Sequence, residues 1–493
     1  MKDTAWAPAL LALYYLILAV LAFYGVHRLL LVVLYLRTRG RKPVRPSDPA
    51  EWPVVTVQLP LYNEMYVARR LIEAVCRLDY PPDRLEIQVL DDSTDETTEI
   101  VAGVVAEQRA RGMDIHHLHR TDRTGFKAGA LAAGLDAARG SLLAVFDADF
   151  VPQAEFLKTA VPYFTDPGIG MVQGSWAHIN RGYSLLTRIQ AILLDGHFFI
   201  EHTARNRNGC FFNFNGTAGV WRREAILAAG GWEHDTLTED LDLSYRAQLA
   251  GWRFLYLPEL SVPSELPVDI NGFKSQQYRW AKGSVQTGRK LLGRILLSRL
   301  PLRVKLEAFV HLTNNLSYAL MFLLALLVFP AMLVRNGTSL TPVFLVDFPL
   351  FFGATLSVLI FYLASQAAAG LGWRKQLRYL PTLMGVGIGL TVNNARAVLS
   401  GLVQRGGTFH RTPKYKIEKR GEDWLSKRYR ARWNTSVIVE VVLAVYFAVC
   451  TLYAAQRGMW PSVPFLYLFV QGYAYMAALS LLPALSGRRR PIL

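Results

Sequence analysis

Apolar residues form long unbroken runs near the two ends of the chain and short runs in its middle. The first long run, Ala7 to Leu36, can cross a bilayer as a helix and exceeds the apolar core of a signal peptide. Further runs of similar length lie after residue 313. We therefore expect five membrane-spanning helices, at Ala7–Leu36, Asn314–Val334, Val343–Ala364, Val437–Ala455 and Val463–Leu482.

Basic residues set the expected orientation of these helices. Arg and Lys follow the first run, Arg488–Arg490 lie near the end of the chain, and such residues collect on the cytoplasmic side of membranes. The stretch Leu383–Val403 is apolar on average but contains Asn393, Asn394 and Arg396. If it crossed the bilayer, the basic segment Gly406–Arg432 would lie outside. The sequence therefore predicts that this stretch lies in the interface, with the N-terminus outside and the C-terminus inside.

The middle of the chain, from about Thr38 to Leu312, has the composition of a globular domain. Its short apolar runs alternate with helical patterns, which predicts a parallel, doubly wound α/β sheet. Polar or glycine-rich clusters follow most of these runs, at the edge where such sheets bind ligands. The expected helices begin near Tyr62, Thr97 and Gly125. The expected strands are Val54–Leu59, ended by Pro60, and Ile87–Leu90, Ile115–Leu118 and Leu142–Phe146.

Two carboxylates directly follow the last of these strands. Asp147 and Asp149 are one residue apart, and positions i and i+2 of a strand face the same way. Both can therefore point out of the carboxyl edge of the sheet. Two hard oxygen ligands suit Mg²⁺ or Mn²⁺ that also holds a diphosphate. The alternative is a solvated turn after the strand.

Composition narrows the class of protein. The chain has 493 residues, 52% of them hydrophobic, and a formal net charge of +16. Its Arg and Lys residues cluster beside apolar runs, so a membrane surface explains the charge better than nucleic acid does. The cysteines, Cys76, Cys210 and Cys450, are odd in number and far apart, so they predict no disulfide framework, no zinc site and a reducing compartment.

Several short motifs, taken together, resemble those of the processive family 2 glycosyltransferases, which include cellulose, hyaluronan and chitin synthases. Closer phrases resemble plant cellulose-synthase-like mannan and xyloglucan-backbone synthases, namely Gln88–Asp95, Lys127–Leu131, Phe214–Gly219 and Gly230–Trp232. The resemblance implies a GT-A-type, Rossmann-like domain with a mostly parallel sheet. The motifs that carry it are Tyr62-Asn63-Glu64, Asp91-Asp92, Lys127, Asp147-x-Asp149, Thr238-Glu239-Asp240 and Gln276-x-x-Arg279-Trp280.

The resemblance also implies roles for single residues. Asp240 is the expected general base, with Glu239 and Thr238 beside it, and Asp147 and Asp149 are the expected metal ligands. Phe409–Lys414 is similar to the F-x-V-T-x-K gating loop of cellulose synthases, with Arg411 in place of the Val. The residues expected to hold the nucleotide-sugar are Pro60, Tyr62, Glu64, Asp91, Asp92, Lys127, Asp147, Gln276, Arg279, Trp280, Thr412 and Lys414.

Each role has a structural alternative. Asp91 or Asp92 could accept the uracil N–H, or could instead cap the N-terminus of a helix, a role that the nearby Ser and Thr could also fill. Lys127 could be a solvated surface lysine, and Trp280 could anchor the chain at the membrane interface. Glu239 and Asp242 could be charges at a helix N-terminus, where Thr238 is a plausible cap. His116, His117 and His119 are expected at the surface rather than as metal ligands.

The expected function is an inverting, metal-dependent transfer that builds a β-1,4-glucan or mannan onto a growing glycan and passes it through the membrane. UDP-glucose is the favoured donor and GDP-mannose the alternative, with Mg²⁺ or Mn²⁺. The alternative function is a glycolipid synthase similar to glucosylceramide synthases. We expect a multi-pass protein of the inner (plasma) membrane with a cytoplasmic catalytic domain. The lipid bilayer is an expected partner and nucleic acid is not, and an accessory export subunit or an oligomer is a further possible partner.

The expected domain organisation follows from these assignments. Residues 1–37 form the first membrane helix and residues 38–287 the glycosyltransferase domain. Residues 288–312, in which Arg and Lys interleave with Leu and Ile, form an amphipathic interface helix. The remaining divisions are residues 313–369 with two membrane helices, 370–434 with an interface helix and the gating-loop-like segment, and 435–493 with two membrane helices and a basic tail.

Overall fold

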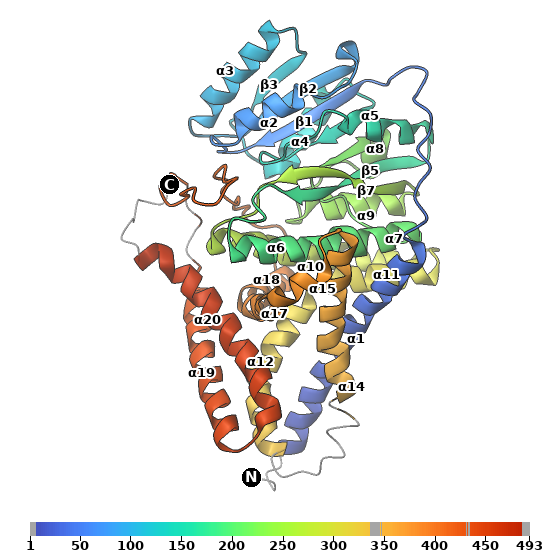
Figure 1. The fold of residues 1–493 in the computed structure, drawn as a ribbon. Helices are drawn as coiled ribbons and strands as arrows, with labels where there is room; N and C mark the ends of the chain where they lie inside the picture. The colour runs from blue at the N-terminus through green and yellow to red at the C-terminus, as the bar shows by residue number, and fades with distance from the viewer. Residues whose placement is uncertain (1–5, 336–345, 347, 430, 432–433, 486–493) are drawn as a thin grey trace.

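The computed structural model describes residues 6–335, 346, 348–429, 431 and 434–485. A sheet domain occupies one end of the molecule, and several long helices extend away from it (Figure 1). Between the two parts lie helices that run across this direction, among them α6 (Leu185–Asp195), α10 (Ile270–Leu297) and α11 (Leu302–Thr313).

The sheet has seven strands in the order β3-β2-β1-β4-β6-β5-β7. Pairing is parallel from β3 to β4 and again between β5 and β7, whereas β6 runs antiparallel to both of its neighbours. This confirms the expected α/β domain with a mostly parallel sheet. The strands are β1 (Val55–Leu61), β2 (Leu85–Asp91), β3 (Ile115–His119), β4 (Leu142–Val145), β5 (Ile169–His178), β6 (Gly219–Arg222) and β7 (Arg253–Ser264).

Hydrophobic cores lie on both faces of the sheet. Leu142 and Ala144 of β4 belong to one core, and Leu143 and Val145 belong to the other, as the alternation of a strand requires. The first core is covered by α2 (Ala68–Val75), α3 (Thr97–Ala110) and α5 (Phe156–Ala160), and the second by α4 (Phe126–Ala137), α8 (Arg223–Ala228) and α9 (Glu239–Leu249).

The boundaries near the first strand differ from the prediction. Pro60 lies inside β1, and the following helix begins only at Ala68 rather than at Tyr62. At Pro60, β1 pairs with β2 but has already passed the last residue paired with β4, which is Gln58. A missing backbone N–H is tolerated where one side of a strand is unpaired.

The interface helix expected at residues 288–312 is observed as parts of two helices. α10 begins much earlier, where the Asp269 side chain accepts hydrogen bonds from the backbone N–H groups of Asn271 and Gly272. It continues through the expected domain boundary at residue 287 to Leu297, and α11 begins at Leu302, directly after Pro301. A proline that follows a helix and precedes the next is a common break, because it cannot continue the first one.

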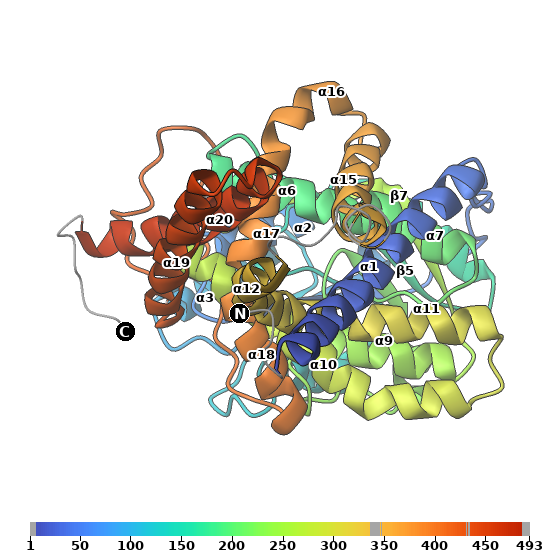
Figure 2. The same ribbon diagram turned by 90° about the horizontal axis from the view of Figure 1, so that it is seen from below.

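Within the described residues, four helices are long and apolar enough to cross a membrane: Ala7–Thr38 (α1), Leu316–Arg335 (α12), Ser436–Gln456 (α19) and Trp460–Leu482, most of which is α20 (Val463–Leu485). A fifth is added if Trp373–Gly389 and Thr391–Val403, which meet at a 41° bend, count as one span. Figure 2 shows α19 and α20 side by side at the edge of this group of helices.

Two of the expected membrane segments differ in detail. Part of Val343–Ala364, residues 343–345 and 347, lies outside the described residues, and the apolar helix that remains, Phe352–Ala368, is shorter than a span. The ambiguous stretch Leu383–Val403 occupies the end of α17 (Leu380–Gly389) and all of α18 (Thr391–Val403). The orientation of the helices relative to a bilayer stays a prediction.

Candidate active site

One pocket collects nearly all the residues that the sequence singled out. It lies between the carboxyl ends of the central strands, the start of α9, the first turns of α10 and the segment that follows α18. Of the expected site residues, only Asp91 does not line it. Those that do are Pro60, Tyr62, Glu64, Asp92, Lys127, Asp147, Asp149, Thr238, Glu239, Asp240, Gln276, Arg279, Trp280, Thr412 and Lys414.

The two carboxylates after β4 both face this pocket. Asp147 Oδ1 accepts a hydrogen bond from Lys127 Nζ at 2.5 Å, and Asp149 Oδ2 accepts one from Lys414 Nζ at 2.8 Å. The backbone N–H of Glu265 also donates to Asp149 Oδ2, at 3.0 Å. Each carboxylate thus offers an oxygen to a cation inside the pocket, so the residues fit a divalent ion that prefers oxygen ligands.

Lys127 is part of the pocket rather than a solvated surface lysine. Its ammonium group also donates to the carbonyl oxygen of Gly216 at 2.8 Å, and it lies 4.0 Å from Glu239. Although burial acts in the opposite direction, the neighbouring carboxylates of Asp147 and Glu239 raise the pKa of Lys127. The side chain is therefore a fixed positive charge among acidic groups.

The acidic residues at the start of α9 separate into two groups. Glu239 and Asp240 line the pocket, and burial together with the charge of Glu239 raises the pKa of Asp240 to about 7. Asp242 is fully buried on another side of the helix, where it pairs with Arg246 at 2.7 Å and Lys290 at 3.0 Å. Asp240 is therefore a carboxyl group poised to exchange a proton near neutral pH, whereas Asp242 holds the helix in place.

Thr238 stands at the cap position of α9, but its side chain does not cap the helix. Its hydroxyl group lies 3.3 Å from the hydroxyl of Thr287, and a Cβ on Gly283 would lie within 3 Å of it. The expectation that the Thr238 side chain caps α9 is wrong. α10 packs so closely that the Thr238 hydroxyl group contacts Thr287 of that helix instead.

The neighbouring carboxylates Asp91 and Asp92 have different environments. Asp92 lines the pocket and accepts two hydrogen bonds from Arg120, at 2.8 and 2.7 Å. Asp91 is fully buried beneath it, and its Oδ2 lies 3.0 Å from His117 Nε2 and 3.3 Å from His119 Nδ1. Burial opposes ionisation, but hydrogen bonds led by that of His117 lower the pKa of Asp91. The structure thus places Asp92, and not Asp91, where it can face a ligand.

Gln276, Arg279 and Trp280 share one face of α10, and that face lines the pocket. Arg279 donates to Thr412 Oγ1 at 3.3 Å and to the carbonyl oxygen of His410, and its guanidinium group lies 4.5 Å from the centre of the Phe409 ring. Burial lowers the pKa of Arg279 to about 10. The contacts tie the helix to the segment that follows α18.

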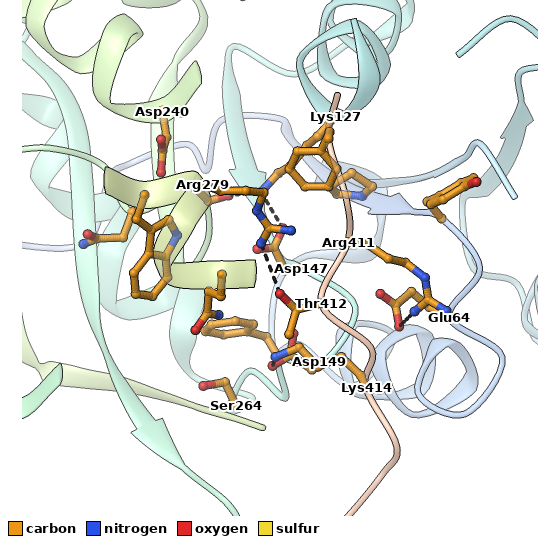
Figure 3. A pocket seen from close by; sticks show the side chains of 18 of the residues that line it. Glu64, Lys127, Asp147, Asp149, Asp240, Ser264, Arg279, Arg411, Thr412 and Lys414 are labelled. Atoms are coloured by element: carbon orange, nitrogen blue, oxygen red, sulfur yellow. Dashed lines mark hydrogen bonds and ion pairs between the residues drawn. The ribbon is translucent and has the colours of Figure 1, made fainter. Parts of the chain in front are cut away.

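That segment, residues 404–429, crosses the pocket. Figure 3 shows Arg411, Thr412 and Lys414 along it, with Arg411 directed towards Glu64 and Lys414 towards Asp149. The Arg411 guanidinium lies 3.2 Å from the Glu64 carboxylate. Burial raises the pKa of Glu64 to about 8, and the charge of Arg411 counteracts this only in part. The residue that departs from the gating-loop motif therefore has a specific acidic partner.

Sequence reasoning missed two charged residues that line this pocket, Glu265 and Arg123. Glu265 accepts hydrogen bonds from the backbone N–H groups of Tyr415 and Lys416, both at 2.9 Å, and so joins the segment to Asp149. It directly follows β7, and the rule that ligands gather after strands could have found it had that strand been predicted. Arg123 places its guanidinium 3.3 Å from the centre of the Tyr62 ring, a contact that no local pattern indicates.

A mostly parallel α/β sheet with paired aspartates and further carboxylates at its carboxyl edge defines a GT-A-type glycosyltransferase domain. A family described as "Glycosyltransferase like family 2" matches residues 53–283. A probable glucomannan 4-beta-mannosyltransferase 3 from Oryza sativa subsp. japonica is 32% identical over 440 residues, covering 86% of this chain and 77% of that protein. The chain therefore belongs to glycosyltransferase family 2.

Other proteins of known sequence or structure are also similar to this chain. Glucomannan 4-beta-mannosyltransferase 7 from Arabidopsis thaliana is 40% identical over 304 residues, covering 58% of this chain and 55% of that protein. The chain spans about half the length of several such curated relatives. The mannosyltransferase PcManGT from Pyrobaculum calidifontis, solved with GDP-Man and Mn2+, covers 79% of this chain and 99% of its own at 21% identity and a TM-score of 0.54, which shows a shared fold.

These findings establish a family 2 glycosyltransferase, and several of its curated relatives are named as glucomannan 4-beta-mannosyltransferases. They do not support the expectation that UDP-glucose is the favoured donor, because the relatives are named as mannosyltransferases.

Proposed function

We propose that this chain is an inverting, metal-dependent β-mannosyltransferase that extends a β-1,4-linked mannan-type glycan from GDP-mannose at a membrane. The observation that carries the proposal is the convergence of the Asp147 and Asp149 carboxylates, the Asp240 carboxyl group and the α10 face on one pocket. The mannosyl donor replaces the expected UDP-glucose because the similar proteins are named as 4-beta-mannosyltransferases, and one is described with GDP-Man and Mn2+.

Asp240 is the residue proposed to take the proton of the acceptor hydroxyl. A sugar hydroxyl is a poor nucleophile until a positioned base removes its proton, and such a base works best with a pKa near the operating pH. The pKa of about 7 meets that condition. Attack on the anomeric carbon from the side opposite the diphosphate inverts the configuration, so an α-linked donor gives a β-linked product.

Cationic side chains on separate elements are proposed to hold the donor diphosphate. Lys127 reaches the pocket from the start of α4, and Arg279 reaches it from α10. Charge-assisted hydrogen bonds from such groups are about twice as strong as those between neutral groups. Trp280 offers a flat apolar face to a pyranose ring, and Tyr62 with Arg123 offers a flat surface to a base.

Asp147 and Asp149 are the residues proposed to hold Mg²⁺ or Mn²⁺. A divalent ion bound there would offset negative charge on the departing nucleoside diphosphate. Lys127 and Lys414, which now pair with these carboxylates, would then be released to contact the donor phosphates.

The membrane arrangement is also a proposal. We place the catalytic domain on the cytoplasmic side of the inner (plasma) membrane and the product path along the helices next to the pocket. Three observations support this arrangement. Basic residues follow α1, α10 and the sheet domain line the same pocket, and the described residues contain four or five candidate spans.

The test supplies purified protein in a bilayer with radiolabelled GDP-mannose or UDP-glucose and Mn²⁺ or Mg²⁺, followed by linkage analysis. A β-1,4-mannan made from GDP-mannose is the expected result, and Asp240→Asn serves as the inactive control. Label from either donor in a solvent-extractable lipid alone would overturn the polymer assignment in favour of a glycolipid synthase. Sugar transfer from UDP-glucose but not from GDP-mannose would overturn the assignment of GDP-mannose as the donor.

A further inference from the structure

A buried ion pair joins α10 to the C-terminal pair of helices. Lys274 Nζ lies 2.7 Å from Glu440 Oε2 of α19, and neither side chain is exposed to solvent. Lys274 Nζ also donates to Ser480 Oγ of α20 at 2.7 Å, and Ser436 Oγ donates to Glu440 Oε1 at 2.9 Å. Three separate helices thus meet at one pair of opposite charges.

The pair lies behind the part of α10 that lines the pocket. With about 100° of rotation per residue, Gln276, Arg279 and Trp280 lie about 140° to 240° around the helix from Lys274. These three residues line the pocket, whereas Lys274 points into the packed helices on the other side. The ion pair therefore holds α10 on the side opposite the pocket, next to the turns that form one wall of the pocket.

The same point also holds the chain shortly before α19. Asn393 of α18 donates to the carbonyl oxygen of Lys274 at 2.9 Å, and Asn434 donates to Asn393 Oδ1 at 2.7 Å. Asn434 lies two positions before the first residue of α19, in the connection between α18 and α19 that also carries Thr412 and Lys414. The helix that supplies Arg279 and the chain shortly before α19 are therefore attached to one small polar cluster.

Stability alone does not explain such a pair. Two buried charges lose their hydration, and well-packed apolar residues of similar volume are commonly as stable or more stable. An ion pair does specify register, because only one alignment of the helices brings both charges together, and any other leaves a charge buried without a partner. Ionisable residues within apolar helices such as α19 are rare and are often functional.

We propose that Lys274 is a positioning residue for the transfer reaction, which acts through its ion pair with Glu440 to fix the register of α10 against α19 and α20. This register sets where Gln276, Arg279 and Trp280 meet the donor and the acceptor. The proposal rests on the proposed function, because it takes this pocket as the site of transfer.

The test replaces the pair with apolar residues, Lys274→Met with Glu440→Leu, in the full chain in lipid nanodiscs. The melting temperature is expected to stay near that of the wild type, while kcat falls at least about tenfold, since small displacements far from the chemistry can cost that much. The acid limb of the pH–rate profile is expected to stay at the same pH, because Asp240 is not altered. A wild-type kcat in the folded double variant would overturn the proposal.

A matched control is the pair of Arg181 and Asp195, which lie 2.7 Å apart. Like the members of the first pair, these residues also contact a polar side chain, here Gln366 of α15 (Ser357–Ala368), and the pair joins α6 to that helix rather than to α10. Arg181→Met with Asp195→Leu is expected to keep the wild-type kcat. An equal loss in this control would show a general effect of removing buried pairs and would also overturn the proposal.

Glu440→Asp covers the case in which the double variant does not fold. It keeps the charge but shortens the side chain by one methylene, so the pair can form only if the helices shift. A several-fold lower kcat at an unchanged melting temperature supports the positioning role, and a wild-type kcat opposes it. Absence of sugar transfer by the wild-type protein would instead count against the proposed function, so the two failures are distinguishable.

Discussion

The pKa of Asp240 leads to a quantitative prediction for the pH dependence of sugar transfer. The residue is buried beside Glu239, and these two causes raise its pKa from 3.8 to about 7. A general base acts only when it is deprotonated, so activity should fall as the pH drops through this value. An exposed aspartate of ordinary pKa would give no such change above about pH 5.

The expected size of the effect follows from the fraction of Asp240 that is ionised. With a pKa of about 7, roughly nine tenths of the residue is ionised at about pH 8 and roughly one tenth at about pH 6. The rate at saturating donor should therefore fall about tenfold between these values, with a limiting slope of one. Glu239→Gln removes a negative neighbour that raises the pKa, so the midpoint should move to lower pH.

The assay measures the initial rate of sugar transfer at saturating donor and metal between about pH 5.5 and 9. The melting temperature is measured at each pH, so that loss of folded protein is excluded. Asp240→Asn should lower the rate by about 10² to 10⁴ and remove the dependence on pH. The reasoning is refuted if the wild-type rate is constant between pH 6 and 8, or if Asp240→Asn keeps the acid limb.

Further predictions concern the metal site, the backbone of the pocket and a buried acid. Asp149→Asn should lower sugar transfer at least about 100-fold with an unchanged melting temperature, and a chelator should inactivate the wild type until Mn²⁺ is restored; full activity in either case would contradict the metal assignment. Gly216→Ala should reduce kcat at least about tenfold, because Gly216 has a φ of +79° and a Cβ would lie 3.1 Å from Asp240 Oδ2 and 3.2 Å from Lys127 Nζ; kinetics like those of the wild type would contradict this crowding. Burial raises the pKa of Glu64 from 4.5 to about 8, so the folded protein keeps a proton that the unfolded chain releases within this range, and stability is lost as the pH rises through it. Thermal scans should therefore show the melting temperature of Glu64→Gln rising relative to the wild type from about pH 5 to 9, and a constant difference would oppose the assignment.

The strands that could be predicted from sequence are those with local apolar runs. β1 to β4 were expected within a few residues of their observed ends, and the paired aspartates after β4 lie at the edge of the sheet as expected. β5, β6 and β7 were not predicted. β6 has only four residues, which is too short for a clear apolar pattern. β7 contains Pro258 and Pro263, and proline within an apolar run argues against a strand. Their pairing with other strands decides their conformation.

The site shows the same division. Motifs indicated most of the pocket residues, but they left open whether Asp91 or Asp92 faces the ligand. Asp91 instead contacts His117 and His119, which lie on the neighbouring strand β3. Glu265 was missed because β7 was not predicted, and its partners, Tyr415 and Lys416, are about 150 positions away along the chain. No window of local sequence contains both sides of such a contact.

The sequence by itself determined the apolar helices, the alternation of strands and helices and the kinds of chemical group available, because these depend on neighbours within a few residues. Only the tertiary structure decided which carboxylates share a pocket, that Asp240 titrates near neutral pH while Asp242 supports a helix, and that Lys274 is fixed by Glu440. Burial and charge partners set these properties, and both arise when distant segments pack together.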